Sequence, residues 1–386
     1  MPGPVRSLPL PLAGGGVREY QVPGQRDWPE RAAPARSRVV FAAAHVVADP
    51  AADQPAAGPA RLDWDATLRF RHRLWSLGLG VADALDTAQR GMGLDWPAAR
   101  ELIRRSGAEA RACGGRLCCG AGTDQLPVGR AGLGDIVAAY EEQLSVVADA
   151  GAQPVLMCSR ALAASARGPD DYAKVYGTLL GQVSRPVILH WLGDMFDPAL
   201  RGYWGSTDLD EATGQVLAIV AEHADRVDGI KVSLLDAERE VALRHRLPPG
   251  VRLYTGDDFN FASLIGGDAY GFSDALLGVF DPLAAPAAVA LGRLDAGDVA
   301  GFRAVLDPLV PLARHIFAAP TQYYKTGVVF LAWLSGYQDH FVMVGGQHQA
   351  GRDRPHLASL FRLAADVGLF PNAGLAMERM RHFLDG

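Results

Sequence analysis

Short apolar segments alternate with amphipathic segments between residue 38 and about residue 280. The apolar segments suit strands buried on both faces, and the amphipathic ones, with apolar residues three and four apart, suit helices. The apolar segments are RVVFAAAHVV, LGVADALDTA, GRLCCGAG, PVLMCSRAL, PVILHWLG, DGIKVSLL, VRLYTGDD and GDAYGFSDALLGV. Strands that alternate with helices favour a parallel sheet. Eight such units over roughly 240 residues predict an α/β fold, a closed (β/α)8 barrel.

The pattern differs at both ends of the chain. Alternating residues in VRSLPLPL and VREYQV, around the run Ala13-Gly14-Gly15-Gly16, predict a β-hairpin. After residue 290 the periodicity is purely helical. We therefore expect an N-terminal extension (1–37), a barrel (38–290) and a helical region packed on it (291–386). The apolar faces of the last helices could close the fold or form a subunit interface, and we expect a homo-oligomer, either a dimer or a tetramer.

The composition and net charge of the chain limit the classes of molecule that we expect it to bind. The chain has 386 residues, of which 49% are hydrophobic, and a formal net charge of −6. That charge argues against nucleic acid or an anionic membrane as a partner, since both require a basic surface. Prolines and glycines interrupt the N-terminus before an apolar run reaches signal-peptide length, and no later run has 18 uninterrupted apolar residues, so we expect a cytoplasmic protein with a small-molecule partner. The four cysteines lack C-x-x-C spacing and are interpreted as reduced thiols rather than a metal site or disulfides.

Functional groups of a (β/α)8 barrel follow the C-terminal ends of its strands. Several polar residues occupy such positions in this chain. In chain order they are His45, Asp86, Thr87, Thr123, Asp124, Ser159, Arg160, His190, Trp191, Asp194, Lys231, Ser233, Thr255, Asp257, Asp258, Ser273 and Asp274.

Lys231 stands out because it lies inside an apolar strand, VDGIKVSLLD. The chain has only three lysines against 34 arginines; Lys174 is expected on a helix surface, and Lys325 begins a later helix that could lie near the barrel mouth. An amine, unlike a guanidinium, can lose its proton and attack a carbonyl to form an imine. A buried lysine paired with Asp257 or Asp258 explains the pattern equally well.

The order of these motifs resembles the dihydrodipicolinate synthase and N-acetylneuraminate lyase family of Schiff-base barrels. DGIKVSLLD resembles the strand that carries the family's imine-forming lysine, which implies that role for Lys231. PVILHWLG, YTGDD, LIGGDAYGFSDALLGVFDP and PTQYYKTGVVFLAWLSG are similar to later segments, and GVADALDTAQRGMGLDWPAARELI to the second strand and its helix. The resemblance covers residues 38–340 and implies a lyase of the class I aldolase type.

Three departures from the family pattern suggest a divergent branch. A Gly-Thr-Thr turn that holds the substrate carboxylate is replaced by Asp86-Thr87-Ala88. His190 stands where the family has a tyrosine that moves protons, and Met195 is nearest to where some members have an arginine. We therefore expect the imine chemistry to act on a different substrate.

The remaining candidates each have two interpretations. His190 could move protons at neutral pH or serve as a hydrogen-bonded structural residue. Asp86 could bind a substrate hydroxyl or pair with Arg90 or Lys231, and Arg160 could bind an anionic group or lie in a surface or interface. The other residues that we expect to bind substrate are Thr87, Ser233, Asp257, Asp258 and Ser273.

The sequence thus predicts a Schiff-base-forming lyase or aldolase that acts on a 2-oxo acid or a sugar-derived keto compound, with no cofactor and no metal. A hydro-lyase could use the same imine. A metal-dependent barrel enzyme for a polyhydroxylated substrate is a second alternative, with His45, His190, Asp257 and Asp258 as ligands. A ligand-binding or assembly protein on a barrel without activity is a third.

Overall fold

Eight parallel strands form a closed barrel in the computed structural model, which describes residues 7–12, 14–24, 26–56 and 58–385. The strand order around the barrel is β10-β3-β4-β5-β6-β7-β8-β9, so that strands adjacent in sequence are adjacent in space and the first pairs with the last. The barrel strands are β3 (Val40–Ala43), β4 (Gly80–Asp83), β5 (Leu117–Ala121), β6 (Gln153–Leu156), β7 (Val187–Leu192), β8 (Val227–Ser233), β9 (Arg252–Thr255) and β10 (Asp274–Leu277). The predicted fold is confirmed, including all eight strands.

Helices follow the strands and cover the outside of the barrel. Their bounds are α1 (Trp64–Ser76), α2 (Trp96–Cys113), α3 (Leu133–Asp149), α4 (Arg160–Ser165), α5 (Pro169–Gln182), α6 (Leu209–Glu222), α7 (Ala237–Arg244), α8 (Phe261–Gly266) and α9 (Ala284–Asp295). Several begin at an aspartate whose side chain accepts a hydrogen bond from a backbone N–H of the first turn, as Asp63 does for α1 and Asp95 for α2. These caps satisfy N–H groups that have no partner within the helix.

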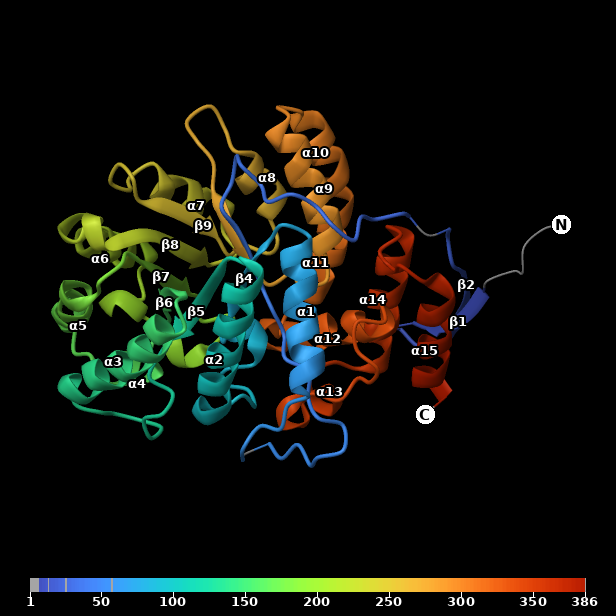
Figure 1. Cartoon of the computed structure of the whole chain (residues 1–386), viewed down its shortest axis with the longest axis horizontal. Coiled ribbons are helices and arrows are strands. Elements are labelled where there is room, and N and C mark those ends of the chain that lie inside the picture. The colour runs from blue at the N-terminus through green and yellow to red at the C-terminus, as the bar shows by residue number, and fades with distance from the viewer. Residues whose placement is uncertain (1–6, 13, 25, 57, 386) are drawn as a thin grey trace.

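The N-terminal hairpin packs on the C-terminal helices. Strands β1 (Ser7–Pro11) and β2 (Val17–Gln21) are antiparallel, as predicted, and the β1 side chains Leu8 and Leu10 are buried. The hairpin lies beside α14 and α15, far from the barrel (Figure 1), and the Tyr20 hydroxyl donates to Asp366 on α14 at 2.6 Å. Ala13, in the expected turn, lies outside the described residues, as do residues 1–6, 25, 57 and 386.

The C-terminal region is helical, as predicted. It consists of α10 (Val299–Leu306), α11 (Val310–Ile316), α12 (Tyr324–Leu334), α13 (Gln347–Ala350), α14 (Arg354–Asp366) and α15 (Ala373–Asp385). All residues of α12 are buried, and its apolar sequence explains why it lies between the barrel and the outer helices. The domain ranges stay a prediction; α9 runs across the boundary expected after residue 290.

Small and large side chains together fill the barrel interior. Phe41, Ala43, Ala82, Cys118, Val155, Ile188, Tyr254 and Leu276 form a core cluster that is separate from the larger one between strands and helices. A Cβ on Gly229 would lie 2.8 Å from the Tyr254 ring, so β8 needs glycine there to leave room for that ring. This packed interior closes the barrel below Lys231, which lies two residues beyond Gly229.

Two further properties concern the described residues only. None of their helices is long and apolar enough to span a membrane. Their four cysteines are free thiols, of which Cys118 and Cys119 are buried, as expected, while Cys113 is exposed at the end of α2.

Candidate active site

The strand register brings Lys231 and His190 together at the C-terminal side of the barrel. Lys231 on β8 is directly paired with His190 on β7 and with Tyr254 on β9. Paired residues of neighbouring strands point to the same face of a sheet. Because Tyr254 belongs to the interior cluster, Lys231 and His190 also point into the barrel.

Lys231 is buried without a contact partner for its charge. The residue is 6% exposed, and no carboxylate in the described part of the chain lies within 4.0 Å of its amine. Burial lowers the pKa of Lys231, although the more distant carboxyl groups of Asp258 and Asp86 oppose that effect. The site therefore favours the neutral amine, the nucleophilic form, more than water does.

Asp258 supplies a carboxyl group near Lys231 from the turn after β9. Its Oδ1 atom accepts a hydrogen bond of 2.7 Å from the backbone N–H of Val279, which fixes it between the ends of β9 and β10. Burial raises the pKa of Asp258, so this carboxyl keeps its proton to a higher pH than an exposed aspartate. Asp258 and Lys231 are thus both shifted toward their neutral forms.

His190 is fully buried and forms part of the cavity wall. Its Nε2 atom lies 3.2 Å from Oγ of Ser233, and its Nδ1 atom is buried with no hydrogen-bond partner in the described residues. Burial, and next the charge of Lys231, lower the pKa of His190 well below its usual value. The imidazole is therefore neutral at physiological pH, with one ring nitrogen left to bind a ligand or a water molecule.

The turn after β4 meets the C-terminal helix α12. Asp86 Oδ1 lies 2.9 Å from the amine of Lys325, and the Thr87 hydroxyl lies 2.9 Å from the hydroxyl of Tyr324. Lys325 and Tyr324 are each 2% exposed. The C-terminal region thus contributes two polar side chains to the barrel mouth; the sequence suggested this place for Lys325 but did not single out Tyr324.

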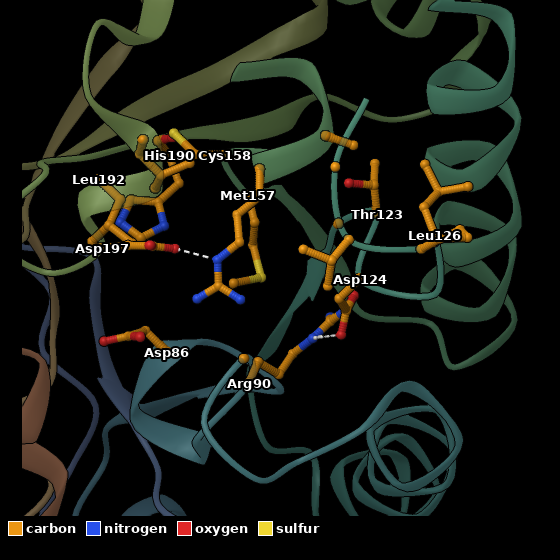
Figure 2. A pocket seen from close by; sticks show the side chains of 18 residues that line it. Asp86, Arg90, Thr123, Asp124, Leu126, Met157, Cys158, His190, Leu192 and Asp197 are labelled. Atoms are coloured by element: carbon orange, nitrogen blue, oxygen red, sulfur yellow. Dashed lines mark hydrogen bonds and ion pairs between the residues drawn. The ribbon is translucent and has the colours of Figure 1, made fainter. Parts of the chain in front are cut away.

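A cavity of about 160 Å³ opens at this mouth, next to His190 and Asp86 (Figure 2). Arg160 also lines it, at the first position of α4, and its Nε donates to Asp197 at 2.5 Å. Arg90 lines it too, but its guanidinium is held by Asp124 and by other acceptors in the wall. Arg160 is therefore the arginine whose terminal nitrogens can still bind an anion.

The predicted site residues fall into three groups. Asp86, Arg160 and His190 line the cavity, whereas Lys231, Thr87, Ser233 and Asp258 are buried beside His190 and Asp86. The third group, Asp257 and Ser273, does not line the cavity.

Asp257 and Ser273 have structural partners. The Asp257 carboxylate accepts hydrogen bonds from the backbone N–H groups of Phe259 and Asn260, which closes its own turn. Ser273 precedes β10, so it lies at the start of that strand and not at the mouth; its hydroxyl donates to Glu240 on α7 at 2.8 Å. The prediction that Ser273 lies at the C-terminal end of a strand was wrong.

The ligand set of the metal alternative is not assembled. His45 Nδ1 lies 2.7 Å from Asp281, and its Nε2 lies 3.0 Å from Gln338, so both ring nitrogens are already bonded. Over the described ranges, no three His, Cys, Asp or Glu side chains lie close enough together to hold a metal ion. His45 instead connects β3 to the C-terminal region.

Several solved structures share the fold. Dihydrodipicolinate synthase from Aquifex aeolicus has 12% identity and a TM-score of 0.65, and the match covers 87% of this chain and 100% of that chain. The enzyme from Thermotoga maritima has 13% identity and a TM-score of 0.64, with 86% and 100% covered. YagE, a prophage protein of the dihydrodipicolinic acid synthase family from E. coli K12 solved in complex with pyruvate, has 14% identity and a TM-score of 0.66, with 86% and 99% covered.

This likeness confirms the predicted resemblance, and at such identities it shows a common fold. No curated protein matches the sequence. A family model described as "Protein of unknown function (DUF993)" matches residues 8–386. That match spans the hairpin, the barrel and the C-terminal helices, and the chain therefore belongs to the DUF993 family.

Proposed function

We propose that the protein is a Schiff-base-forming lyase or aldolase that acts on a 2-oxo acid or a sugar-derived keto compound, with Lys231 as the nucleophile. The observation that carries this proposal is a buried, inward-pointing lysine that no carboxylate of the described residues contacts and that is paired across strands with His190, which lines a cavity. The shared fold supports it, since one of the similar structures, YagE, was solved with pyruvate, a 2-oxo acid.

In the proposed reaction the Lys231 amine attacks the substrate carbonyl carbon, and the resulting carbinolamine loses water to form a protonated imine. The imine draws the electron pair of the neighbouring carbon–carbon bond as that bond breaks, while the hydroxyl on the departing carbon gives its proton to a base, which leaves an enamine and releases a carbonyl product. The enamine then takes up a proton, and water hydrolyses the imine to free Lys231. In the hydro-lyase variant a base first removes a proton from the carbon next to the imine, and the resulting enamine then expels the hydroxyl of the following carbon, which takes up a proton and leaves as water.

His190 and Asp258 have complementary proton-transfer properties. Burial keeps His190 unprotonated, so it can accept a proton, whereas burial keeps the proton on Asp258, so it can donate one. In this proposal Ser233 orients the His190 ring through its hydroxyl. Arg160 would bind an anionic group of the substrate with its terminal nitrogens, while Asp197 holds its Nε.

The proposal is tested by incubating the protein with a panel of 2-oxo acids and keto sugars in the presence of borohydride. Borohydride reduces an imine to a stable secondary amine, whose mass identifies the ketone. We expect peptide mapping to find this mass increase on Lys231 and not on Lys174, which is exposed on α5. Product analysis with the trapped ketone separates carbon–carbon cleavage from dehydration.

The assembly and the location stay predictions. We propose a homo-oligomer, a dimer or a tetramer, in the cytoplasm; sedimentation of the purified protein tests the first.

A further inference from the structure

Lys325 is a second buried lysine at the barrel mouth, and it comes from outside the barrel. It is the second residue of α12, and its amine lies 2.9 Å from Asp86 Oδ1 and 3.2 Å from the carbonyl oxygen of Gln322. Its amine also lies 4.7 Å from the centre of the Tyr324 ring. A buried ammonium is costly without such partners, so Asp86 and Lys325 stabilise each other as an ion pair.

Asp86 interacts with both lysines of the mouth. It contacts Lys325 directly, and its charge also raises the pKa of Lys231 without contact; both Asp86 and His190, the strand partner of Lys231, line the same cavity. The ammonium of Lys325 largely neutralises the carboxylate that it contacts. Lys325 therefore decides how strongly Asp86 attracts a proton to Lys231.

The other elements around Lys231 supply few charges. Asp258 faces it from the turn after β9, His190 from β7 and the Cys118 thiol from β5. Asp258 is shifted toward its neutral acid and His190 toward its neutral ring by burial. Burial likewise raises the pKa of Cys118 and keeps its thiol protonated. Asp86 is thus the group near Lys231 whose charge depends on a separate partner.

Tyr254, the paired residue on β9, does not change this balance. Its hydroxyl donates to Asp228, at the second position of β8, and so bonds toward the opposite end of the barrel from the mouth. Tyr324, on α12, has its hydroxyl beside Thr87 and Asp86, and burial raises its pKa well above the usual value, so it stays neutral.

We propose that Lys325 is a positioning residue for Lys231: it holds Asp86 in an ion pair, prevents that carboxylate from pairing with Lys231, and so keeps the Lys231 amine free to attack a carbonyl. This inference deepens the proposed function and rests on it. It gives the C-terminal helix α12 a role in the chemistry, although Lys325 itself does not touch the substrate.

The test measures the protonation of Lys231 directly. Acetic anhydride acetylates only neutral amines, so the yield of acetyl-Lys231, quantified by peptide mass spectrometry across a pH series, gives the midpoint for loss of its proton. In Lys325→Met the free Asp86 carboxylate should pair with Lys231 and raise that midpoint by about one pH unit or more. Lys325→Arg, which keeps the charge, should restore it, and Lys174→Met is the matched surface control.

Two further variants make the result decisive. Asp86→Asn leaves Lys325 without its partner and removes the attracting carboxylate, so the midpoint should fall; this variant also replaces Lys325→Met if that protein does not fold. The double variant Asp86→Asn with Lys325→Met should lie close to the wild type. An unchanged midpoint in either folded single variant overturns the proposal.

Because acetylation needs no substrate, it tests the role of Lys325 independently of the lyase proposal. If the midpoint shifts as expected but borohydride traps no ketone on Lys231, the charge coupling stands and the lyase proposal fails. If a ketone is trapped but the midpoint does not move, the lyase proposal stands and the role of Lys325 fails.

Discussion

At the scale of single residues, the site combines three ionisable groups that burial shifts toward their neutral forms. Burial lowers the pKa of Lys231 and His190 and raises that of Asp258. In the proposed mechanism these shifts favour a nucleophilic amine at Lys231, a proton acceptor at His190 and a proton donor at Asp258 more than exposed groups would. Such opposite shifts in adjacent groups are common where acid and base catalysis occur in one site.

His190 should be needed for proton transfer but not for imine formation. We expect His190→Phe to lower turnover of the trapped ketone by about 10²- to 10⁴-fold, the usual contribution of a general acid or base, while borohydride trapping on Lys231 persists. Steady-state kinetics and trapping on the same samples check this. His382→Phe, an exposed histidine on α15, is the control, and normal turnover in His190→Phe would return His190 to a structural role.

At the scale of elements, the close packing of β8 and β9 holds Lys231 in place. A Cβ on Gly256, directly after β9, would lie 2.2 Å from Ser233 Oγ, 2.8 Å from the Val232 carbonyl oxygen and 2.9 Å from Lys231 Cε. Even one methyl group there must displace the strand end or the site residues. The lack of space for a side chain, and not a positive φ angle, therefore explains the glycine at position 256.

Gly256→Ala should therefore damage the site. We expect at least a tenfold slower trapping of a ketone on Lys231, because a displaced amine loses its orientation. Gly214→Ala is a matched control: this glycine lies inside α6 with no atom near the new Cβ, so alanine should be tolerated and should stabilise the helix by up to about 1 kcal/mol. Equal trapping rates in the two variants would contradict the packing argument.

Helix α7 is attached to the barrel by a buried acid, Glu240. It accepts hydrogen bonds from Ser273 and Thr255, and burial raises its pKa to about 8. In the unfolded chain the group titrates near 4.5. The folded state therefore holds a proton that the unfolded chain releases between these values, so this contribution to stability is complete below pH 4.5 and is lost as the pH rises toward 8.

The expected consequence is a fall in Tm between pH 5 and pH 8 that depends on Glu240. Glu240→Gln, which cannot ionise, should show a smaller fall than the wild type in thermal melts at the two pH values. Glu238→Gln, an exposed residue on the same helix, should behave as the wild type does. If Tm falls by the same amount between the two pH values in Glu240→Gln and in the wild type, Glu240 is not the group responsible.

At the scale of the whole molecule, the site is built jointly by the barrel and the C-terminal helices. Thr87 and Tyr324, whose hydroxyls touch, are 237 residues apart, and Asp86 meets Lys325 in the same region. The barrel strands were predictable because each is a continuous apolar run with a turn after it. Contacts between such distant residues leave no periodic pattern, which is why Tyr324 and the partner of Asp86 were not predicted.

Ser273 and Asp257 show that sequence patterns also failed to predict contacts within short segments. Ser273 follows an aromatic loop in which Tyr270 and Phe272 are exposed, so the apolar run begins before the strand does and its polar residues were assigned to the wrong end. Asp257 and Asp258 are adjacent and chemically identical. Only the backbone conformation decides that Asp257 closes its own turn while Asp258 bonds to Val279 and interacts electrostatically with Lys231.

Borohydride trapping in Lys231→Arg, compared with the wild type, tests the central claim most directly. Arginine keeps the positive charge and much of the volume of lysine but cannot act as the nucleophile. With the ketone that labels the wild type, we expect neither a mass increase nor turnover in Lys231→Arg, provided that circular dichroism shows an intact fold. Turnover at the wild-type rate in that variant would contradict the covalent mechanism.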